Sequence, residues 1–243
     1  MGANVKYSLD GGVATIQIDD GKRNALSPDV FRELNAALDQ AERDRAIVIL
    51  TGREQVFSAG FDLKVMKSGG ANALRMLHAG YSLTARVLSH PYPVIAACNG
   101  HVLAMGVFLM LSSDYVIGTR GDFKVSANEV ALGLTMPRVA AAMLRHRLRP
   151  ADFQTAVALS KYFPVDEARD AGFFDELAEE AALMSRARAR AAEFSKLDLP
   201  AHAASKRRIR RQLVRDIRCS ISLDIVDALV MGLKAVARPR RQS

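Results

Sequence analysis

The sequence lacks several features that would place it in well-defined classes of protein. It contains no tryptophan and only two cysteines, Cys98 and Cys219, in 243 residues. Two cysteines give neither a disulfide framework nor the spacing of a metal site. We therefore expect no metal and a reducing, cytoplasmic location. The longest apolar run, residues 102–111, spans about ten residues where a bilayer needs about 20, and the N-terminus lacks the basic-then-apolar order of a signal peptide.

Familiar catalytic motifs are also missing. There is no Gly-x-Ser-x-Gly elbow of a serine hydrolase, no P-loop and no glycine fingerprint of a dinucleotide site. The five histidines are scattered along the chain. His101 is closest to the loops discussed below, and an isolated histidine there favours a structural role.

The charge is positive, with 34 lysines and arginines against 26 acidic residues, a net +8. Such a balance favours anionic partners such as nucleic acid, an acidic membrane surface or a phosphorylated cofactor. Much of the excess lies in residues 206–218, where seven residues are basic and only Asp216 is acidic. We expect this segment to form a helix with Ile209, Leu213 and Ile217 on its inner face and the basic side chains outside.

The hydrophobic pattern alternates between strand and helix. Asp10-Gly11-Gly12 joins two strand-like segments and predicts a hairpin, and Ser27-Pro28 is typical of a helix start. Segment 52–60 is expected to be a loop, and the chain after Pro137 is expected to be mostly helical. The other strands are predicted at 46–51, 93–98 and 115–119, and the other helices at 28–43, 72–88 and 105–112. An α/β or α+β core with a helical C-terminal extension follows from this order.

Two loops follow buried strands and lead towards helices, residues 57–64 and 99–106. Small residues in them allow a ligand to approach the backbone, and a helix start presents unpaired amides. Two such amides directed at one oxygen would form an oxyanion hole.

These loops carry a resemblance to the crotonase superfamily, the enoyl-CoA hydratase/isomerase family. Similarity to its signature is found in Phe57-Ser58-Ala59-Gly60-Phe61-Asp62-Leu63-Lys64, in Pro93-Val94-Ile95-Ala96-Ala97-Cys98-Asn99-Gly100, in Asn24-Ala25-Leu26-Ser27 and in Asp166-Glu167-Ala168, and it spans roughly residues 5 to 200 in the family's order. The resemblance implies a crotonase-like spiral of ββα turns over residues 1–198, with a helical extension and basic tail over 199–243. It also implies a homotrimer or a dimer of trimers.

The same resemblance assigns roles to individual residues. The oxyanion amides fall on Phe61 and Met105, and Phe61 stands where many relatives have alanine, which would narrow the pocket. The substrate is expected to be an acyl-CoA or enoyl-CoA thioester, so coenzyme A enters as part of the substrate and no separate cofactor is expected. Ala59 would contact the adenine end, and Lys64 is either a phosphate partner or a solvated surface lysine. The complete set of expected substrate-binding residues is Ala59, Gly60, Asp62, Leu63, Lys64, Gly106 and Phe108.

Hydratases of this family use two glutamates, and only one has a counterpart here. The first position is occupied by Phe108, whereas Asn128-Glu129 before a Leu-Gly turn matches the second. A single carboxyl among apolar walls should be desolvated, with a raised pKa and greater basicity. The resemblance thus implies an enzyme of fatty-acid metabolism in which Glu129 transfers a proton, and isomerisation is at least as plausible as hydration.

Two other functions stay open at this point. With one carboxylate left, the protein could bind acyl-CoA without catalysis. The basic segment 206–218 could bind RNA, as one crotonase-like group does, although the sequence shows no aromatic stacking motif and no RNA-binding module, so we expect no nucleic-acid partner.

Overall fold

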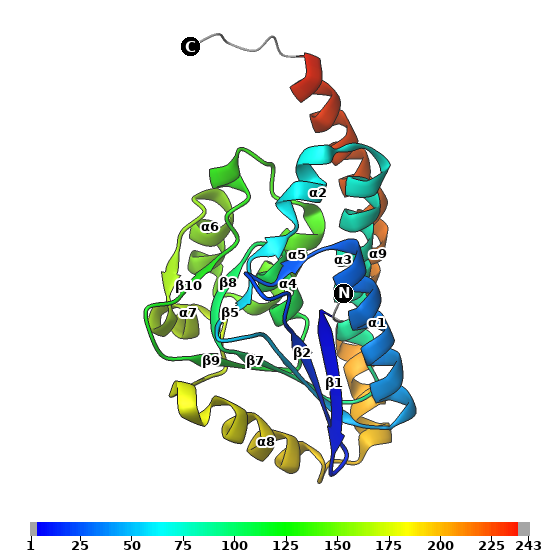
Figure 1. Ribbon diagram of the computed structural model, residues 1–243, viewed down its shortest axis with the longest axis vertical. Coiled ribbons are helices and arrows are strands. Elements are labelled where there is room, and N and C mark those ends of the chain that lie inside the picture. The colour runs from blue at the N-terminus through cyan, green and yellow to red at the C-terminus, as the bar shows by residue number, and fades with distance from the viewer. Residues whose placement is uncertain (1–3, 238–243) are drawn as a thin grey trace.

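The structure is a computed structural model that describes the backbone of residues 4–237 and the side chains of residues 4–231 (Figure 1). Its largest sheet has six strands in the order β1-β2-β4-β7-β9-β12. Only β1 and β2 pair in antiparallel fashion, and the later strands are all parallel. The strands are β1 (Val5–Asp10), β2 (Val13–Ile18), β4 (Ile47–Thr51), β7 (Val94–Cys98), β9 (Tyr115–Thr119) and β12 (Glu176–Ala178).

The predicted hairpin and the predicted strands are confirmed. Gly11 and Gly12 have φ values of 55° and 78°, as a tight turn between two twisted strands requires. Every residue of β4 and of β7 is buried, because helices cover both faces of the parallel part of the sheet. Figure 1 shows α8 (Leu183–Phe194) on one face, with α1 (Pro28–Arg43) and α3 (Gly70–Ser89) on the other.

A second sheet accompanies the first and was not predicted. It contains four strands in the order β11-β10-β8-β5, and a two-stranded pair joins β3 to β6. Two of its strands lie in segments that the sequence analysis treated as loops, at 52–60 and from residue 99. These strands are too short to show alternation. The bounds are β3 (Ala25–Leu26), β5 (Gln55–Ser58), β6 (Gly60–Phe61), β8 (Gly100–Leu103), β10 (Lys124–Ser126) and β11 (Phe163–Pro164).

The two sheets together show the ββα spiral. Each turn places one strand in the large sheet and the next in the small one. The strands β4, β7 and β9 are neighbours in the large sheet, and their successors β5, β8 and β10 are neighbours in the small sheet. Helices follow the strand pairs: α2 (Leu63–Ser68) and α3 after the first, and α4 (Met105–Leu111) after the second. The fold class predicted from the sequence is thus confirmed.

The remaining helices lie in the second half of the chain, as predicted after Pro137, although β11 and β12 interrupt them. They are the short η1 (Val130–Leu132), α5 (Arg138–Arg147), α6 (Pro150–Ala158), α7 (Val165–Ala171), the short η2 (Glu180–Ala182), α8 and α9 (Leu199–Ala237). Among the described residues, no helix is long and apolar enough to span a membrane. The basic tail at 238–243 and residues 1–3 lie outside the described residues.

Helix α9 corrects the predicted face of the basic segment. Ile209 is 75% exposed, whereas Lys206 is 4% exposed and Arg210 is buried. Both cations pair with the carboxylate of Asp114, at 2.6 Å and 3.0 Å. The half-buried Asp114 carboxylate thus draws two cations of α9 inward, where apolar side chains had been predicted. Ile217 is buried, as expected.

Candidate active site

Hydrogen bonds to Asn24 hold the first site loop. Asn24 is fully buried and has a positive φ of 52°. Its side-chain amide donates hydrogen bonds to the carbonyls of Ile18 and Phe57, at 2.8 Å and 3.2 Å. The Ser58 hydroxyl donates in return to the Asn24 carbonyl at 2.8 Å. These bonds fix the chain between β5 and β6. Asn24 belongs to the Asn-Ala-Leu-Ser motif that the sequence analysis singled out.

The two site loops meet at Gly60 and Met105. Gly60 has a φ of +91°, and a methyl group added to it would lie 2.9 Å from the Ala104 Cβ and 3.2 Å from the Met105 nitrogen. Only glycine allows this approach. On the other side, a methyl group on Gly106 would lie 2.8 Å from the Ser58 carbonyl oxygen. The backbone of β6 and the start of α4 are therefore in direct contact.

Phe61 and Met105 both adjoin this junction, since Phe61 follows Gly60 and the Met105 nitrogen lies close to it. The Asp62 amide donates to the Leu26 carbonyl of β3 at 3.2 Å. Because successive strand amides point to opposite sides, the Phe61 amide points away from β3. Met105 is the first residue of α4, where an amide has no acceptor within its own helix. The arrangement brings together the two residues predicted to supply the oxyanion hole.

The Phe61 ring packs against the hydrophobic core. Its centroid lies 5.9 Å from those of Phe31 on α1 and Tyr81 on α3, in edge-on geometry. The ring also covers Gly80, where a Cβ would be only 2.6 Å from a ring carbon. A glycine on α3 thus makes room for a phenylalanine on β6.

Glu129 is buried, with 7% exposure, just ahead of η1. Within the described part of the chain, its Oε2 atom and the neighbouring Asn128 Oδ1 atom have no hydrogen-bond partner. Burial raises the pKa of Glu129 to about 7. Buried polar atoms are rarely left unpaired, so two side by side indicate a place for a ligand. The carboxyl is thus desolvated, as the sequence analysis expected.

Tyr81 lies next to the oxyanion strand, because its ring packs edge-on against Phe61 of β6. Burial, and then the negative charges of Asp224 and Glu129, raise the pKa of Tyr81 above its ordinary value. Tyr81 falls within the helix predicted at residues 72–88, and no functional role was predicted for it. The acidic Asp224 within an apolar stretch of α9 is the sequence signal that could have pointed to this region.

The other predicted site residues have mixed environments. Phe108 lies on α4, is buried in the hydrophobic core and provides no carboxylate to the site. Asp62 caps α2, because its Oδ1 atom accepts the Lys64 amide at 2.7 Å. Ala59 is half-buried and donates its amide to the Arg23 carbonyl at 3.0 Å. Leu63 and Lys64 are exposed beside it.

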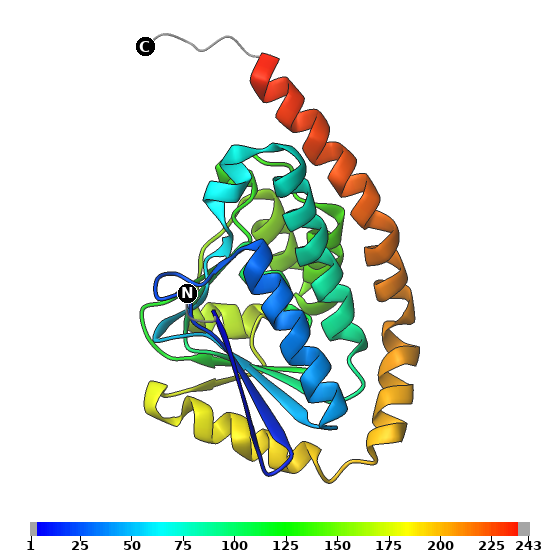
Figure 2. The same ribbon diagram turned by 45° about the vertical axis from the view of Figure 1, so that its right-hand side comes forward.

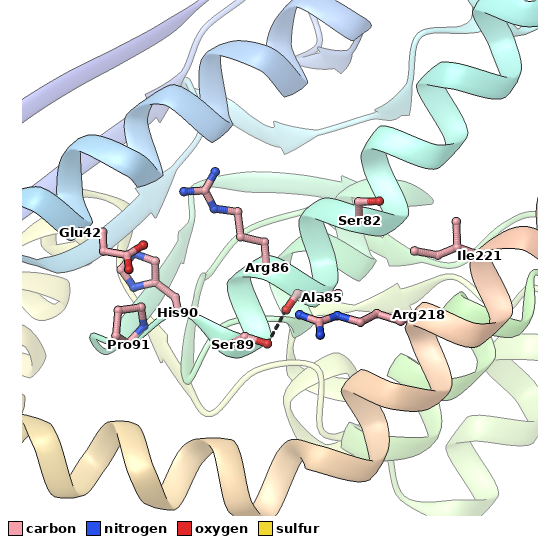
Figure 3. A pocket seen from close by; sticks show the side chains of 9 residues that line it. All are labelled: Glu42, Ser82, Ala85, Arg86, Ser89, His90, Pro91, Arg218 and Ile221. Carbon is pink, nitrogen blue, oxygen red and sulfur yellow. Dashed lines mark hydrogen bonds between the residues drawn. The ribbon is translucent and has the colours of Figure 1, made fainter.

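A cavity of about 380 Å³ opens elsewhere, between α1, α3 and α9 (Figure 3). It contains neither Glu129 nor the oxyanion residues. The guanidinium of Arg86 is directed towards α1, where it pairs with Asp39 at 2.5 Å. Glu42 and Arg218 stand on opposite sides of the cavity, so its wall carries both signs of charge. The cavity lies apart from the residues that the two site loops bring together.

Comparison with known proteins defines the class of this chain. The sequence model described as enoyl-CoA hydratase/isomerase matches residues 8–224, so the chain belongs to that family. Its relatives are named as hydratases and as isomerases, and the chain is an enzyme of this type. This class does not favour the acyl-CoA binder or the RNA-binding homologue that the sequence left open.

Individual relatives give the degree of similarity. A family protein of known structure from Pseudomonas syringae is 44% identical, with a TM-score of 0.90 over 91% of this chain and 96% of its own. The probable enoyl-CoA hydratase EchA3 of Mycobacterium tuberculosis is 40% identical, with a TM-score of 0.91 over 97% of this chain and 100% of its own. The probable enoyl-CoA hydratase EchA17 of Mycobacterium avium is 34% identical over 81% of this chain and 76% of its own.

Proposed function

We propose that this enzyme moves the double bond of an enoyl-CoA between C3 and C2, with Glu129 as the only proton carrier. The observation that carries the proposal is that Glu129 is buried with its Oε2 atom unpaired, while the position of the other family glutamate is occupied by the core residue Phe108. Coenzyme A enters as part of the thioester, and no separate cofactor takes part.

The chemistry needs a base and a place for negative charge. The Glu129 carboxylate removes a proton from C2 of the 3-enoyl thioester, and the electron pair of that C–H bond delocalises onto the thioester oxygen. The amides of Phe61 and Met105 stabilise this oxyanion. The dienolate then takes the same proton back from Glu129 at C4, which leaves the double bond between C2 and C3. No atom is gained or lost, so one carboxyl suffices.

Hydration makes a greater demand on the site. Water must be held and activated while a proton is delivered to C2, and Phe108 offers no polar atom for this. Two solved structures support the preference for isomerisation. One is a second structure of the Mycobacterium tuberculosis protein EchA3 compared above, described there as a probable hydratase and here as an enoyl-CoA isomerase; it is 40% identical, with a TM-score of 0.89. The other, a human mitochondrial delta3-delta2-enoyl-CoA isomerase, is 26% identical, with a TM-score of 0.84.

Several finer features belong to the same proposal. The exposed Lys64 beside the first loop contacts a phosphate of coenzyme A. The enzyme assembles as a homotrimer or a dimer of trimers and works in the cytoplasm on intermediates of fatty-acid breakdown. Each feature rests on the family resemblance and on the exposure of this loop.

The direct test is a product assay with both substrate types. Incubated with a 3-enoyl-CoA, the enzyme should yield the 2-enoyl-CoA. Incubated with the 2-enoyl-CoA, it should yield far less 3-hydroxyacyl-CoA than isomerised product. Rapid accumulation of the 3-hydroxy product would show a hydratase, and turnover of neither substrate would contradict the proposal.

The oxyanion hole has its own test in Gly60→Ala. The added methyl group would press on the Met105 nitrogen and on Ala104, so the two amides must separate. We expect kcat to fall by about 100-fold, the usual effect of losing one oxyanion donor. Gly12→Ala in the β1–β2 hairpin is the matched control, because Gly12 also has a positive φ, of +78°, but no atom within 4 Å of an added Cβ. Equal activity of the two variants would argue against the assigned oxyanion residues.

A further inference from the structure

Asp224 of α9 caps another helix across the fold. Its Oδ1 atom accepts the Arg138 amide and its Oδ2 atom the Val139 amide, both at 3.0 Å. These are the first amides of α5, whose own N-cap residue, Pro137, makes no side-chain cap. A carboxylate at this position pairs otherwise orphaned donors and interacts favourably with the helix dipole. The side chain of Asp224 is only 3% exposed.

The same contact fixes one end of the segment that carries the base. Residues 129–137 run from Glu129 to the start of α5, and this stretch includes the short η1. Near its other end, the Ala131 amide donates to the Ser160 hydroxyl at 3.0 Å. The Glu129 carboxyl contributes no hydrogen bond that would hold it in place through Oε2. Its position therefore depends on the anchors of the segment.

Helix α9 lies next to the site as well as to α5. Figure 2 shows α9 running alongside α3, the helix that carries Tyr81. The Tyr81 ring packs on Phe61 of the oxyanion strand, and the negative charges of Asp224 and Glu129 both raise its pKa. Helix α9 thus packs on the helix that supports the oxyanion strand as well as on α5.

We propose that Asp224 is a positioning residue, through which helix α9 holds the 129–137 segment and sets the location of Glu129. The inference rests on the proposed role of Glu129 as the base. Asp224 touches no substrate in this scheme, and it acts only through the start of α5.

The test compares Asp224→Asn with Asp227→Asn. Asparagine keeps the size of Asp224 but has one acceptor oxygen, and its amino group would meet the second amide of α5. Asp227 lies one turn away, is 54% exposed and pairs with the same Arg138 at 2.5 Å. The control therefore removes a charge near Arg138 and leaves both amides of α5 capped.

The first readout is amide hydrogen exchange across residues 129–137 in the free protein. Exchange should accelerate about tenfold in Asp224→Asn, because the segment loses the anchor that caps the start of α5. In Asp227→Asn it should match the parent. The second readout is the titration of the Glu129 carboxyl by carbon NMR, assigned with Glu129→Gln. Its pKa should fall from about 7 towards the ordinary range in Asp224→Asn, because the freed segment admits water.

Activity supplies the third readout. We expect kcat with a 3-enoyl-CoA to fall on the order of tenfold in Asp224→Asn with KM nearly unchanged, because a displaced base slows chemistry more than binding. A lower melting temperature with unchanged exchange in 129–137 and an unchanged carboxyl titration would mean that the cap is structural only, which would overturn the proposal. If the wild type shows no isomerase activity while exchange and titration respond as expected, the anchor stands and the proposed reaction fails.

Discussion

Asp114 and Glu129 are carboxyls with opposite surroundings. Asp114, whose side chain is 14% exposed, accepts hydrogen bonds from Lys206 at 2.6 Å and from the Val94 amide at 2.7 Å, and it pairs with Arg210 at 3.0 Å. Glu129 is buried, yet its Oε2 atom has no partner among the described residues. Asp114 thus has two cationic partners, whereas Glu129 has no cation beside it in any ion pair of the described residues.

The difference separates a structural role from a functional one. Taking a carboxylate out of water costs several kcal/mol unless partners replace the hydration. At Asp114 the partners come from α9, so burial there holds a helix against the sheet. At Glu129 the cost persists and appears as a raised pKa, which a proton-transfer site needs and a structural site does not.

The largest expected effect is on activity, in Glu129→Gln. The amide cannot accept the C2 proton, so kcat should fall by about 10²- to 10⁴-fold. Binding of a non-reactive acyl-CoA should be retained, since the amide fills the same space. Steady-state assays and calorimetric binding measure the two quantities. Full activity in this variant would show that Glu129 has no catalytic role, so that Glu129 and Asp114 would no longer differ in function.

The next effect is on stability, in Asp114→Asn. Removing one member of a buried ion cluster leaves Lys206 and Arg210 as uncompensated charges, which typically costs about 3–5 kcal/mol. Chemical denaturation should show this loss of unfolding free energy. Asp39→Asn is the control: its ion pair with Arg86 is exposed on the acidic side, and such pairs contribute about 1 kcal/mol or less. Similar losses in both variants would indicate that burial of the Asp114 cluster has no special weight.

The pH dependence of stability sharpens the contrast further. The pKa of Glu129 is raised from 4.5 to about 7 in the folded state, so the folded protein holds a proton that the unfolded chain releases. This stabilisation is fully present below pH 4.5 and is lost as pH rises through 7, for a total of about 3 kcal/mol. The wild type should therefore lose stability relative to Glu129→Gln between pH 5 and pH 8.

Activity should move in the opposite direction over the same range. The base works only when ionised, so kcat/KM should rise with pH to a plateau above about pH 7. As pH rises through about 7, kcat/KM would therefore increase while the free energy of unfolding decreases. Parallel denaturation curves for the wild type and Glu129→Gln at every pH, together with a rate profile that rises near pH 4.5, would mean that the carboxyl is solvated.

Features that depend on local motifs could be predicted from the sequence. The two loops at 57–64 and 99–106 follow from small residues after buried strands, whereas the roles of Phe61, Met105 and Glu129 came from the family resemblance and stay predictions. The hairpin and the first helix were equally local: Ser27 accepts a hydrogen bond from the Val30 amide, as a capping serine should. Strands β5 and β8 were missed because each has four residues and owes its form to pairing with the other.

Contacts between distant segments were beyond the reach of the sequence. Lys206 and Arg210 looked like surface charges, since nothing in α9 reveals that Asp114 lies opposite them. Asp224 was overlooked for the same reason, because its partners at the start of α5 are 85 and 86 residues away. In both cases an acidic group and its donors come from far-apart segments, and only the folded chain brings them together.

The smallest expected effects distinguish two neighbours on α9, Lys206 and Arg207. Burial lowers the pKa of the Lys206 ammonium to about 8, although Asp114 opposes this. Lys206→Met removes that desolvation cost while Arg210 still holds Asp114, so the loss of stability should be about 1–3 kcal/mol, below that of Asp114→Asn. Arg207 is exposed, and Arg207→Met should change the unfolding free energy by less than about 0.5 kcal/mol. If the two variants were equally stable, the ion cluster of Asp114, Lys206 and Arg210 would not hold α9 against the sheet. The structural role assigned to Asp114 would then be wrong.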